Sequence, residues 1–104
     1  MIVRINDDSF AYEVLREKRL VIVDFSASWC GPCKLLSPVL EKISSENKNI
    51  KITQIDVDES PMVSNKYNIR SIPMLIFFKN GRVVDEIVGF VPKDIINEII
   101  ADNL

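Results

Sequence analysis

Apolar and polar positions divide the chain into alternating strand-like and helix-like segments. Residues 20–27, LVIVDFSA, form an almost continuous apolar run, which is typical of a strand covered on both faces. Further strands are expected at residues 2–5, 50–57, 74–79 and 82–88. The last two of these flank Asn80-Gly81, a strong signal for a two-residue hairpin turn, so they should pair antiparallel.

Between the strands, apolar residues recur at helical spacing. Helices are expected after a cap at Asn6 or Asp7, over residues 32–46, over residues 60–67, and from Pro92 onward. In the third of these, Ser60 should supply the cap. The apolar faces are Phe10, Val14 and Leu15, then Leu36, Val39, Leu40 and Ile43, and finally Ile95, Ile96, Ile99 and Ile100.

The predicted order of elements, β-α-β-α-β-α-β-β-α, indicates an α/β fold with one mixed sheet between helices. Right-handed crossovers make the early strands parallel, and the hairpin adds an antiparallel pair at one edge. The 104 residues contain no repeat or linker, so residues 1–104 are expected to form a single domain.

Composition and charge exclude several classes of function. The formal net charge of −2 gives no reason to expect nucleic acid or an anionic membrane as a partner. No apolar run in the chain is long enough to cross a bilayer. The N-terminal residues lack the features of a secretory signal. We therefore expect a cytoplasmic protein in a reducing compartment, and a monomer.

Both cysteines, Cys30 and Cys33, lie two residues apart where residues 20–27 give way to a predicted helix. A C-x-x-C pair beside a β-α-β pattern is typical of a dithiol that cycles to a disulfide. A zinc site is not expected, because zinc needs about four Cys or His ligands and the chain has two Cys and no His. The absence of His also excludes Ser/His/Asp and Cys/His catalysis. No cofactor is expected beyond a redox-active Cys30–Cys33 disulfide.

The segment VDFSASWCGPCK, residues 23–34, resembles the active-site segment of the thioredoxin family. The similarity continues at Pro38, at residues 56–58 (DVD), at 66–73 (KYNIRSIP), at 77–81 (FFKNG) and at 88–89 (VG). The resemblance implies the thioredoxin fold, with a five-stranded sheet of order 1-3-2-4-5 flanked by four helices. It also implies a cis Ile72-Pro73 bond facing the cysteines, which the sequence alone would not indicate, since only about 5% of such bonds are cis.

The two cysteines are expected to differ in role. Cys30 precedes the helix as the exposed nucleophile, where free backbone N–H groups and the helix dipole favour a thiolate. Cys33, one turn further on, should be shielded and resolve the mixed disulfide. Lys34 is interpreted as a solvated helix charge, with a role in tuning the thiolate as the alternative.

The resemblance implies a Cys30 pKa of about 7, a known example for this family, against about 8.5 for an ordinary thiol. At pH 7 this raises the thiolate fraction about sixteen-fold. The weaker basicity lowers nucleophilicity about five-fold, so the net gain is only a few-fold. Most of the rate must then come from holding the target disulfide in line with Cys30.

Asp24 is an acidic residue within the apolar run of residues 20–27. If this carboxyl group is buried, desolvation should raise its pKa, which suits a base that deprotonates Cys33. The alternative is an exposed residue at a sheet edge. The apolar neighbours favour burial.

By analogy with the family, an apolar rim surrounds the dithiol and binds substrate. Its members are Trp29, Gly31, Pro32, Val57, Ile72, Pro73, Val88, Gly89 and Phe90. Core packing is an equally good interpretation for Val57 and Val88. Met74 and Phe90 depart from residues common in the family, and this leaves the range of substrates open.

The sequence thus predicts a protein-disulfide reductase whose partners are disulfide-containing proteins and a thioredoxin reductase as electron donor. Two alternatives remain. One is an oxidase or isomerase of the same fold, which Gly31-Pro32 and the lack of a secretory signal disfavour. The other is a redox-independent binding subunit, for which replacing Cys30 would leave function intact.

Overall fold

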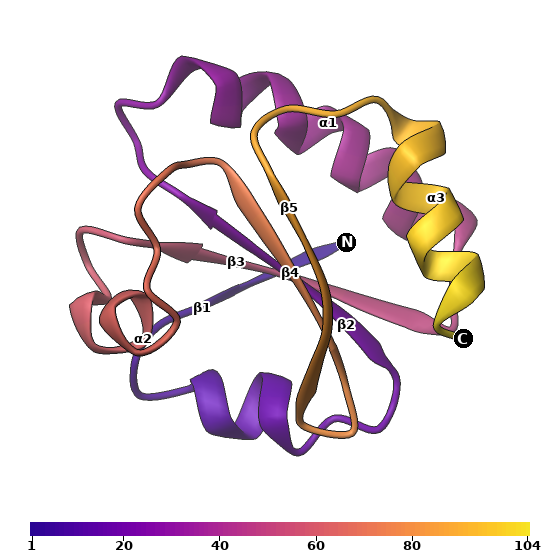
Figure 1. Ribbon diagram of the computed structural model, residues 1–104, viewed down its shortest axis with the longest axis horizontal. Coiled ribbons are helices and arrows are strands. Elements are labelled where there is room, and N and C mark those ends of the chain that lie inside the picture. Colours follow the sequence, from indigo (N-terminus) through magenta and orange to yellow (C-terminus); the bar gives the residue numbers. More distant parts are fainter.

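A computed structural model describes all residues, 1–104, and shows a central sheet with helices on both sides (Figure 1). The strands are β1 (Ile2–Ile5), β2 (Leu20–Ser26), β3 (Ile50–Asp56), β4 (Met74–Lys79) and β5 (Arg82–Val88). The helices are the short π-helical turn η1 (Ala11–Leu15), α1 (Gly31–Glu46), α2 (Pro61–Lys66) and α3 (Lys93–Asp102). Each lies where the sequence predicts an element, with bounds shifted by a few residues at most except at η1.

The five strands form one sheet in the order β1-β3-β2-β4-β5. β3 pairs parallel with β1 and with β2, whereas β4 runs antiparallel to β2 and to β5. The predicted mixed sheet and its strand order are therefore confirmed. Its last two strands keep the bounds that the sequence predicts, Met74–Lys79 and Arg82–Val88.

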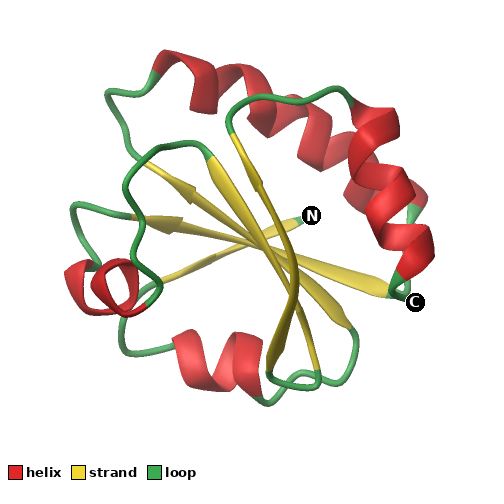
Figure 2. Cartoon of the chain, viewed as in Figure 1, coloured by secondary structure: helices red, strands yellow, loops and turns green.

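Alternating side chains of β2 enter two separate cores, one on each face of the sheet. Val21, Val23 and Phe25 pack under η1 and α2, and Leu20 and Ile22 pack under α1 and α3. Figure 2 shows α1 and α3 on one side of the strands, with η1 and α2 on the other. Every residue of β2 is buried, as expected for a strand covered on both faces. By the same alternation, Asp24 faces α1.

Not every predicted apolar face is buried. In α3, Ile96 and Ile100 are buried and Ile99 is partly buried, but Ile95 is 39% exposed, so its predicted place against the sheet is wrong. The reason is geometric, because Ile95 and Ile96 are separated by about 100° around a helix. No helix in the structure combines the length and apolar character that crossing a bilayer needs.

The N-terminus of α2 is capped from a distant part of the chain. The carboxylate of Asp7 accepts hydrogen bonds from the backbone N–H groups of Met62 (3.1 Å) and Val63 (2.9 Å). Ser60, the predicted cap, makes no side-chain hydrogen bond, and its hydroxyl is buried without a partner. The prediction for Ser60 is wrong because the negative charge of Asp7 satisfies the same N–H groups and suits the positive end of the helix dipole.

The β4–β5 turn has the backbone expected of an Asn-Gly hairpin. Asn80 and Gly81 both have positive φ, 52° and 78°, as a tight hairpin turn of this type requires. A Cβ on Gly81 would lie 2.9 Å from the carbonyl oxygen of Leu15. Two reasons therefore favour glycine at position 81: its positive φ, and the close approach of its backbone to η1.

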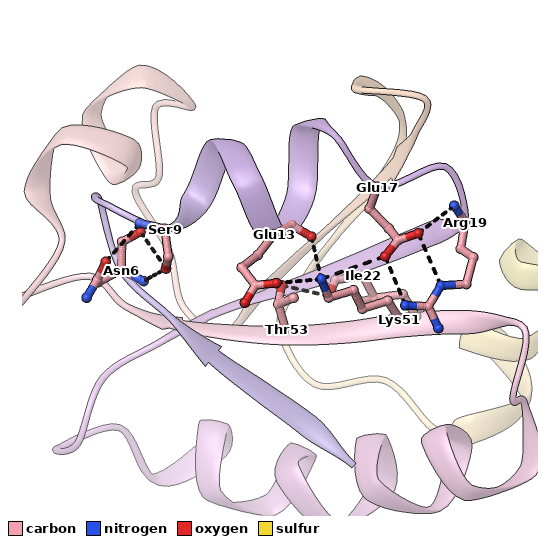
Figure 3. A network of polar contacts seen from close by, with 8 residues as sticks. All are labelled: Asn6, Ser9, Glu13, Glu17, Arg19, Ile22, Lys51 and Thr53. Atoms are coloured by element: carbon pink, nitrogen blue, oxygen red, sulfur yellow. Dashed lines mark hydrogen bonds and ion pairs between the residues drawn. The ribbon is translucent and has the colours of Figure 1, made fainter.

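Lys51 joins β3 to η1 through a network of polar contacts (Figure 3). Its Nζ donates to the carbonyl oxygen and to Oε1 of Glu13, both at 2.8 Å, and lies 3.8 Å from Oε1 of Glu17. Glu17 also accepts from the Arg19 guanidinium. The Lys51 side chain is only 12% exposed, so water solvates its charge poorly. The neighbouring carboxylates compensate that charge.

Candidate functional site

The two cysteines lie at the junction of β2 and α1 and form a disulfide, with their Cα atoms 5.3 Å apart. This confirms that the C-x-x-C pair forms a disulfide. Cys30 is the residue before the helix, and its Sγ accepts a hydrogen bond from the backbone N–H of Cys33 (3.2 Å). The same N–H would stabilise negative charge on that sulfur once the disulfide is reduced.

The prediction of an exposed Cys30 is wrong for this oxidised state. Cys30 is 5% exposed and Cys33 is 3% exposed, so the two differ little. Both pack with Ala27, and Val57 and Ile72 close over them. Exposure therefore does not distinguish the attacking sulfur, but position does, because Cys30 lies before the first helical turn and Cys33 lies within it.

Asp24 is completely buried on β2, as predicted. Burial raises the pKa of its carboxyl group to about 6, and a hydrogen bond from Gln54 partly opposes this rise. Oδ2 accepts from Gln54 Nε2 at 3.0 Å, whereas no protein group donates to Oδ1. A carboxyl group in this state can exchange a proton close to neutral pH.

Gln54 and Ser37 connect this acid to α1. Gln54 lies beside Asp24 in the register of β2 and β3. Its Nε2 is also 3.4 Å from Ser37 Oγ, and that hydroxyl donates to the carbonyl oxygen of Cys33 at 3.4 Å. A chain of hydrogen bonds thus runs from the buried carboxyl group to the backbone of the second cysteine.

A polar surface cavity of about 190 Å³ opens beside Cys33. It is lined by Arg4, Ser26, Ala27, Ser28, Cys33, Lys34, Ser37, Gln54 and Asp56. Its volume accommodates several water molecules, each of which occupies about 30 Å³ in the liquid. Cys33, which the sequence predicts to be shielded, thus lies between the protein core and a polar opening.

Trp29 is the most prominent apolar side chain near the dithiol. It is 69% exposed, and its indole N–H donates to Asp58 Oδ2 at 2.8 Å. Asp58 lies within a tight turn in which Asp56 Oδ1 accepts hydrogen bonds from the backbone N–H groups of Asp58 and Glu59. The turn after β3 therefore fixes the indole of the residue that precedes Cys30.

The Ile72-Pro73 bond is cis, as the family resemblance implies. Ile72 is partly buried against the cysteines, and Pro73 is buried. The carbonyl oxygen of Pro73 accepts from the N–H of Gly89 at 2.8 Å, which connects this loop to the end of β5. The structure thus brings Pro73 and Gly89 together, and it brings Val57 and Ile72 onto the disulfide.

The remaining predicted residues are exposed around this centre. Gly31 and Pro32 form the exposed first turn of α1, and Lys34 borders the cavity. Val88 is 61% exposed and Phe90 is 47% exposed, so the core-packing alternative for Val88 is wrong.

Sequence reasoning missed Asp58, Ser37 and the role of Gln54. A polar residue inside the predicted strand 50–57 was the available signal for Gln54. No group of three or more His, Cys, Asp or Glu side chains is placed to hold a metal ion.

Comparison with known proteins gives consistent matches along the whole chain. The model of the family described as Thioredoxin matches residues 1–102. Thioredoxin of Staphylococcus aureus is 43% identical over 104 residues, covering 99% of this chain and 98% of that protein. Thioredoxin 1 of Nostoc sp. is 41% identical over 102 residues, covering 97% and 95%. Thioredoxin of Mycoplasmoides gallisepticum is 41% identical over 88 residues, covering 85% and 88%.

Proposed function

The chain belongs to the thioredoxin family and is a protein-disulfide reductase, and on that premise we propose the role of each residue in the exchange reaction. Cys30 attacks, Cys33 resolves, and Asp24 is the base that activates Cys33. The observation that carries the first two roles is the hydrogen bond from the Cys33 N–H to Cys30 Sγ at the start of α1. It favours a thiolate at Cys30 over one at Cys33.

In the first step, the Cys30 thiolate attacks one sulfur of a target disulfide. A Cys30–target bond forms, the target S–S bond breaks, and the second target sulfur leaves as a thiolate that takes up a proton. The result is a mixed disulfide. The packing of Val57 and Ile72 on the cysteines means that the target must approach from the Trp29 and Gly31-Pro32 side.

In the second step, Cys33 gives its proton to the ionised Asp24, and its thiolate attacks Cys30 Sγ. The Cys30–target bond breaks, the second target thiol is released, and Cys30–Cys33 becomes the disulfide seen in the structure. Two electrons have then passed to the target. Asp24 suits this role because its pKa of about 6 lets it accept a proton near neutral pH and release it afterwards.

The substrate surface that we propose is the rim of Trp29, Gly31, Pro32, Val57, Ile72, Pro73, Val88, Gly89 and Phe90. Exposed apolar side chains at Trp29, Val88 and Phe90 support it. The segment before Pro73 also offers backbone groups with which an extended target peptide could pair as an added strand. We place Lys34 at its margin, as a charge beside the cavity.

We also propose a thioredoxin reductase as the electron donor and disulfide-containing proteins as targets. The names of the related proteins support both, and purified reductase with NADPH tests the first. The cytoplasmic location and the monomeric state remain predictions from the sequence, which fractionation and sedimentation can test. The reduction potential of the Cys30–Cys33 pair separates a reductase from an oxidase, because a strongly oxidising value would contradict the proposal.

The assignment of roles is tested with insulin as the target and dithiothreitol as the reductant. Cys30→Ser should abolish reduction, whereas Cys33→Ser should accumulate the mixed disulfide with Cys30. Asp24→Asn should prolong the life of the mixed disulfide in the otherwise wild-type protein, while the rate of Cys30 attack changes little. An unchanged lifetime would remove Asp24 from the mechanism.

A further inference from the structure

The polar cavity beside Cys33 lies at the carboxyl ends of two neighbouring parallel strands, β2 and β3. After these strands the chain turns to opposite sides of the sheet, because β2 continues into α1 and β3 continues into α2 (Figure 2). In open α/β sheets, ligands bind in the crevice that such a divergence opens. We propose that this cavity binds a free α-amino acid with a short side chain. The inference is independent of the roles proposed for Asp24 and the two cysteines.

The inner part of the cavity carries hydrogen-bond acceptors that no protein group uses. Ser26, the last residue of β2, lies beside Asp56, the last residue of β3, and both line the cavity. Asp56 Oδ1 accepts two backbone N–H groups of the following turn, whereas its Oδ2 has no protein partner. The hydroxyl groups of Ser26 and Ser28 make no hydrogen bond within the protein either. Three acceptors at the strand ends match the three N–H donors of an ammonium group.

Two cations border the same cavity and have no ionic partner. Arg4 on β1 and Lys34 on α1 both line it, and both are exposed. None of the protein's ion pairs includes Arg4, Lys34 or Asp56. The two cations therefore stay beyond ion-pair distance of the carboxylate that shares their cavity. Guanidinium and ammonium groups are strong hydrogen-bond donors to a carboxylate, so these two side chains suit the acidic end of a ligand.

The charges and the size of the cavity favour a small ligand that carries both signs. A simple anion would attract Arg4 and Lys34 but repel Asp56, and a simple cation would do the reverse. An α-amino acid has its ammonium and carboxylate groups on one carbon atom, so it can satisfy both kinds of side chain together. The volume of about 190 Å³ corresponds to about six water molecules, which is close to the size of alanine.

This site is separate from the surface that we propose for protein targets. No residue of the apolar rim around the dithiol lines the cavity, whereas Cys33 belongs to both the cavity and the disulfide. An amino acid bound here would lie beside the second cysteine and leave the exposed Trp29 side open to a target. The cavity would thus add a small-molecule site to a protein whose proposed targets are proteins.

The experiment titrates the oxidised protein with L-alanine and follows the backbone amide signals of Ser28 and Asp56 by NMR. Saturable shifts with a Kd in the millimolar range are expected for a ligand of this size. Propionate lacks the ammonium group and ethylamine lacks the carboxylate, so each should bind at least about ten-fold more weakly. Propionate or ethylamine binding as well as L-alanine would show a simple anion or cation site and overturn the inference. The absence of saturable shifts would overturn it too.

Two substitutions test the two ends of the ligand. Asp56→Asn keeps an oxygen for the turn and removes the charge; its matched control is Asp85→Asn on β5, where the carboxylate also accepts a backbone N–H. Arg4→Gln is compared with Arg82→Gln on the opposite edge strand.

Asp56→Asn should weaken L-alanine binding about ten-fold or more, and both controls should change it less than about two-fold. The exposed Arg4 should contribute about three-fold. If Asp56→Asn does not fold, Ser26→Ala replaces it, with an expected loss of about three-fold. Folded site variants that bind L-alanine as tightly as their controls would contradict the proposal.

Discussion

Asp24 and Lys51 are ionisable residues on neighbouring central strands, but the protein treats them in opposite ways. Asp24 lies near the end of β2 under α1, completely buried, with one carboxyl oxygen lacking a partner. Lys51 lies near the start of β3 under η1, and its ammonium group meets two oxygens of Glu13 and lies near Glu17. Because β2 and β3 are parallel, the two sites lie toward opposite ends of the sheet and on opposite faces.

This difference separates Asp24, a residue that we propose for catalysis, from Lys51, a residue that holds the fold together. At Lys51, neighbouring carboxylates compensate the buried charge, and the contact holds η1 on the sheet. At Asp24, a neutral amide contacts the carboxyl group and no cation pairs with it, so ionisation stays costly. A costly ionisation lowers stability at neutral pH but keeps the pKa where a proton can be exchanged. If Asp24 has the role that we propose, stability and reactivity belong to different faces of the sheet.

Among the substitutions that test this comparison, Asp24→Asn is expected to change the free energy of unfolding most. The folded pKa of about 6 exceeds the ordinary value of 3.8, so the neutral carboxyl group favours the folded state. That stability is fully present below about pH 3.8 and is lost as the pH rises through about 6. The loss amounts to about 3 kcal/mol. At pH 7.5 the variant should therefore be more stable by up to about 3 kcal/mol, measured by urea unfolding.

The pH dependence gives the control for that experiment. The advantage of Asp24→Asn should shrink as the pH falls from 7.5 to 4, because the wild-type carboxyl group is then neutral too. Glu98→Gln, which replaces an exposed acid on α3, should change the free energy of unfolding by less than about 0.5 kcal/mol. A constant difference across the pH range would show that Asp24 destabilises by packing and not by charge.

Lys51→Met should have the next largest effect and the opposite sign. It leaves the carboxylates of Glu13 and Glu17 without their common cation and removes a hydrogen bond to the backbone of η1. A loss of about 1–3 kcal/mol is expected in urea unfolding. Lys93→Met is the matched control, because the Lys93–Glu46 pair is more exposed and should contribute less than about 1 kcal/mol. Equal effects of the two substitutions would contradict the structural role of Lys51.

The smallest effect is expected from Glu17→Gln, and it should disappear as the solution is made acidic. Hydrogen bonds from the Arg19 side chain and backbone lower the pKa of Glu17 to about 2, below the ordinary value of 4.5. Stability from this contact is present above about pH 4.5 and is lost as the pH falls through about 2. The contact is close to solvent, so removing it should cost less than about 1 kcal/mol at pH 6. Unfolding curves from pH 6 to pH 2 should converge with wild type, and added salt should reduce the difference.

The sequence predicts most of the fold because its strongest signals are local. Asn80-Gly81 determines where β4 ends and β5 begins, since both residues must adopt positive φ. The burial of Asp24 is predictable for a related reason. A polar residue inside a strand that is apolar on both faces can scarcely avoid the core. The C-x-x-C spacing likewise predicts a disulfide without any knowledge of the tertiary structure.

The features that escape prediction depend on contacts between distant residues. Nothing near Ser60 indicates that Asp7 will cap α2, and nothing near Lys51 indicates that Glu13 will lie above it. Low exposure of Cys30 follows from Val57 and Ile72, which reach it from other elements. Side-chain orientation at Gln54 depends on the register of β2 and β3, which a single sequence leaves open.

The contact between Asp7 and α2 has a practical consequence for work at the N-terminus. The cap is separated from the helix that it stabilises by 55 residues of sequence. The same helix follows the turn that holds Asp58 against the Trp29 indole. A fusion tag or a trimming that displaces the first seven residues should therefore disturb α2 and, through the preceding turn, the Trp29 surface where we propose that targets dock. Attachments to this protein are better placed after α3, whose last residues touch neither α2 nor the dithiol.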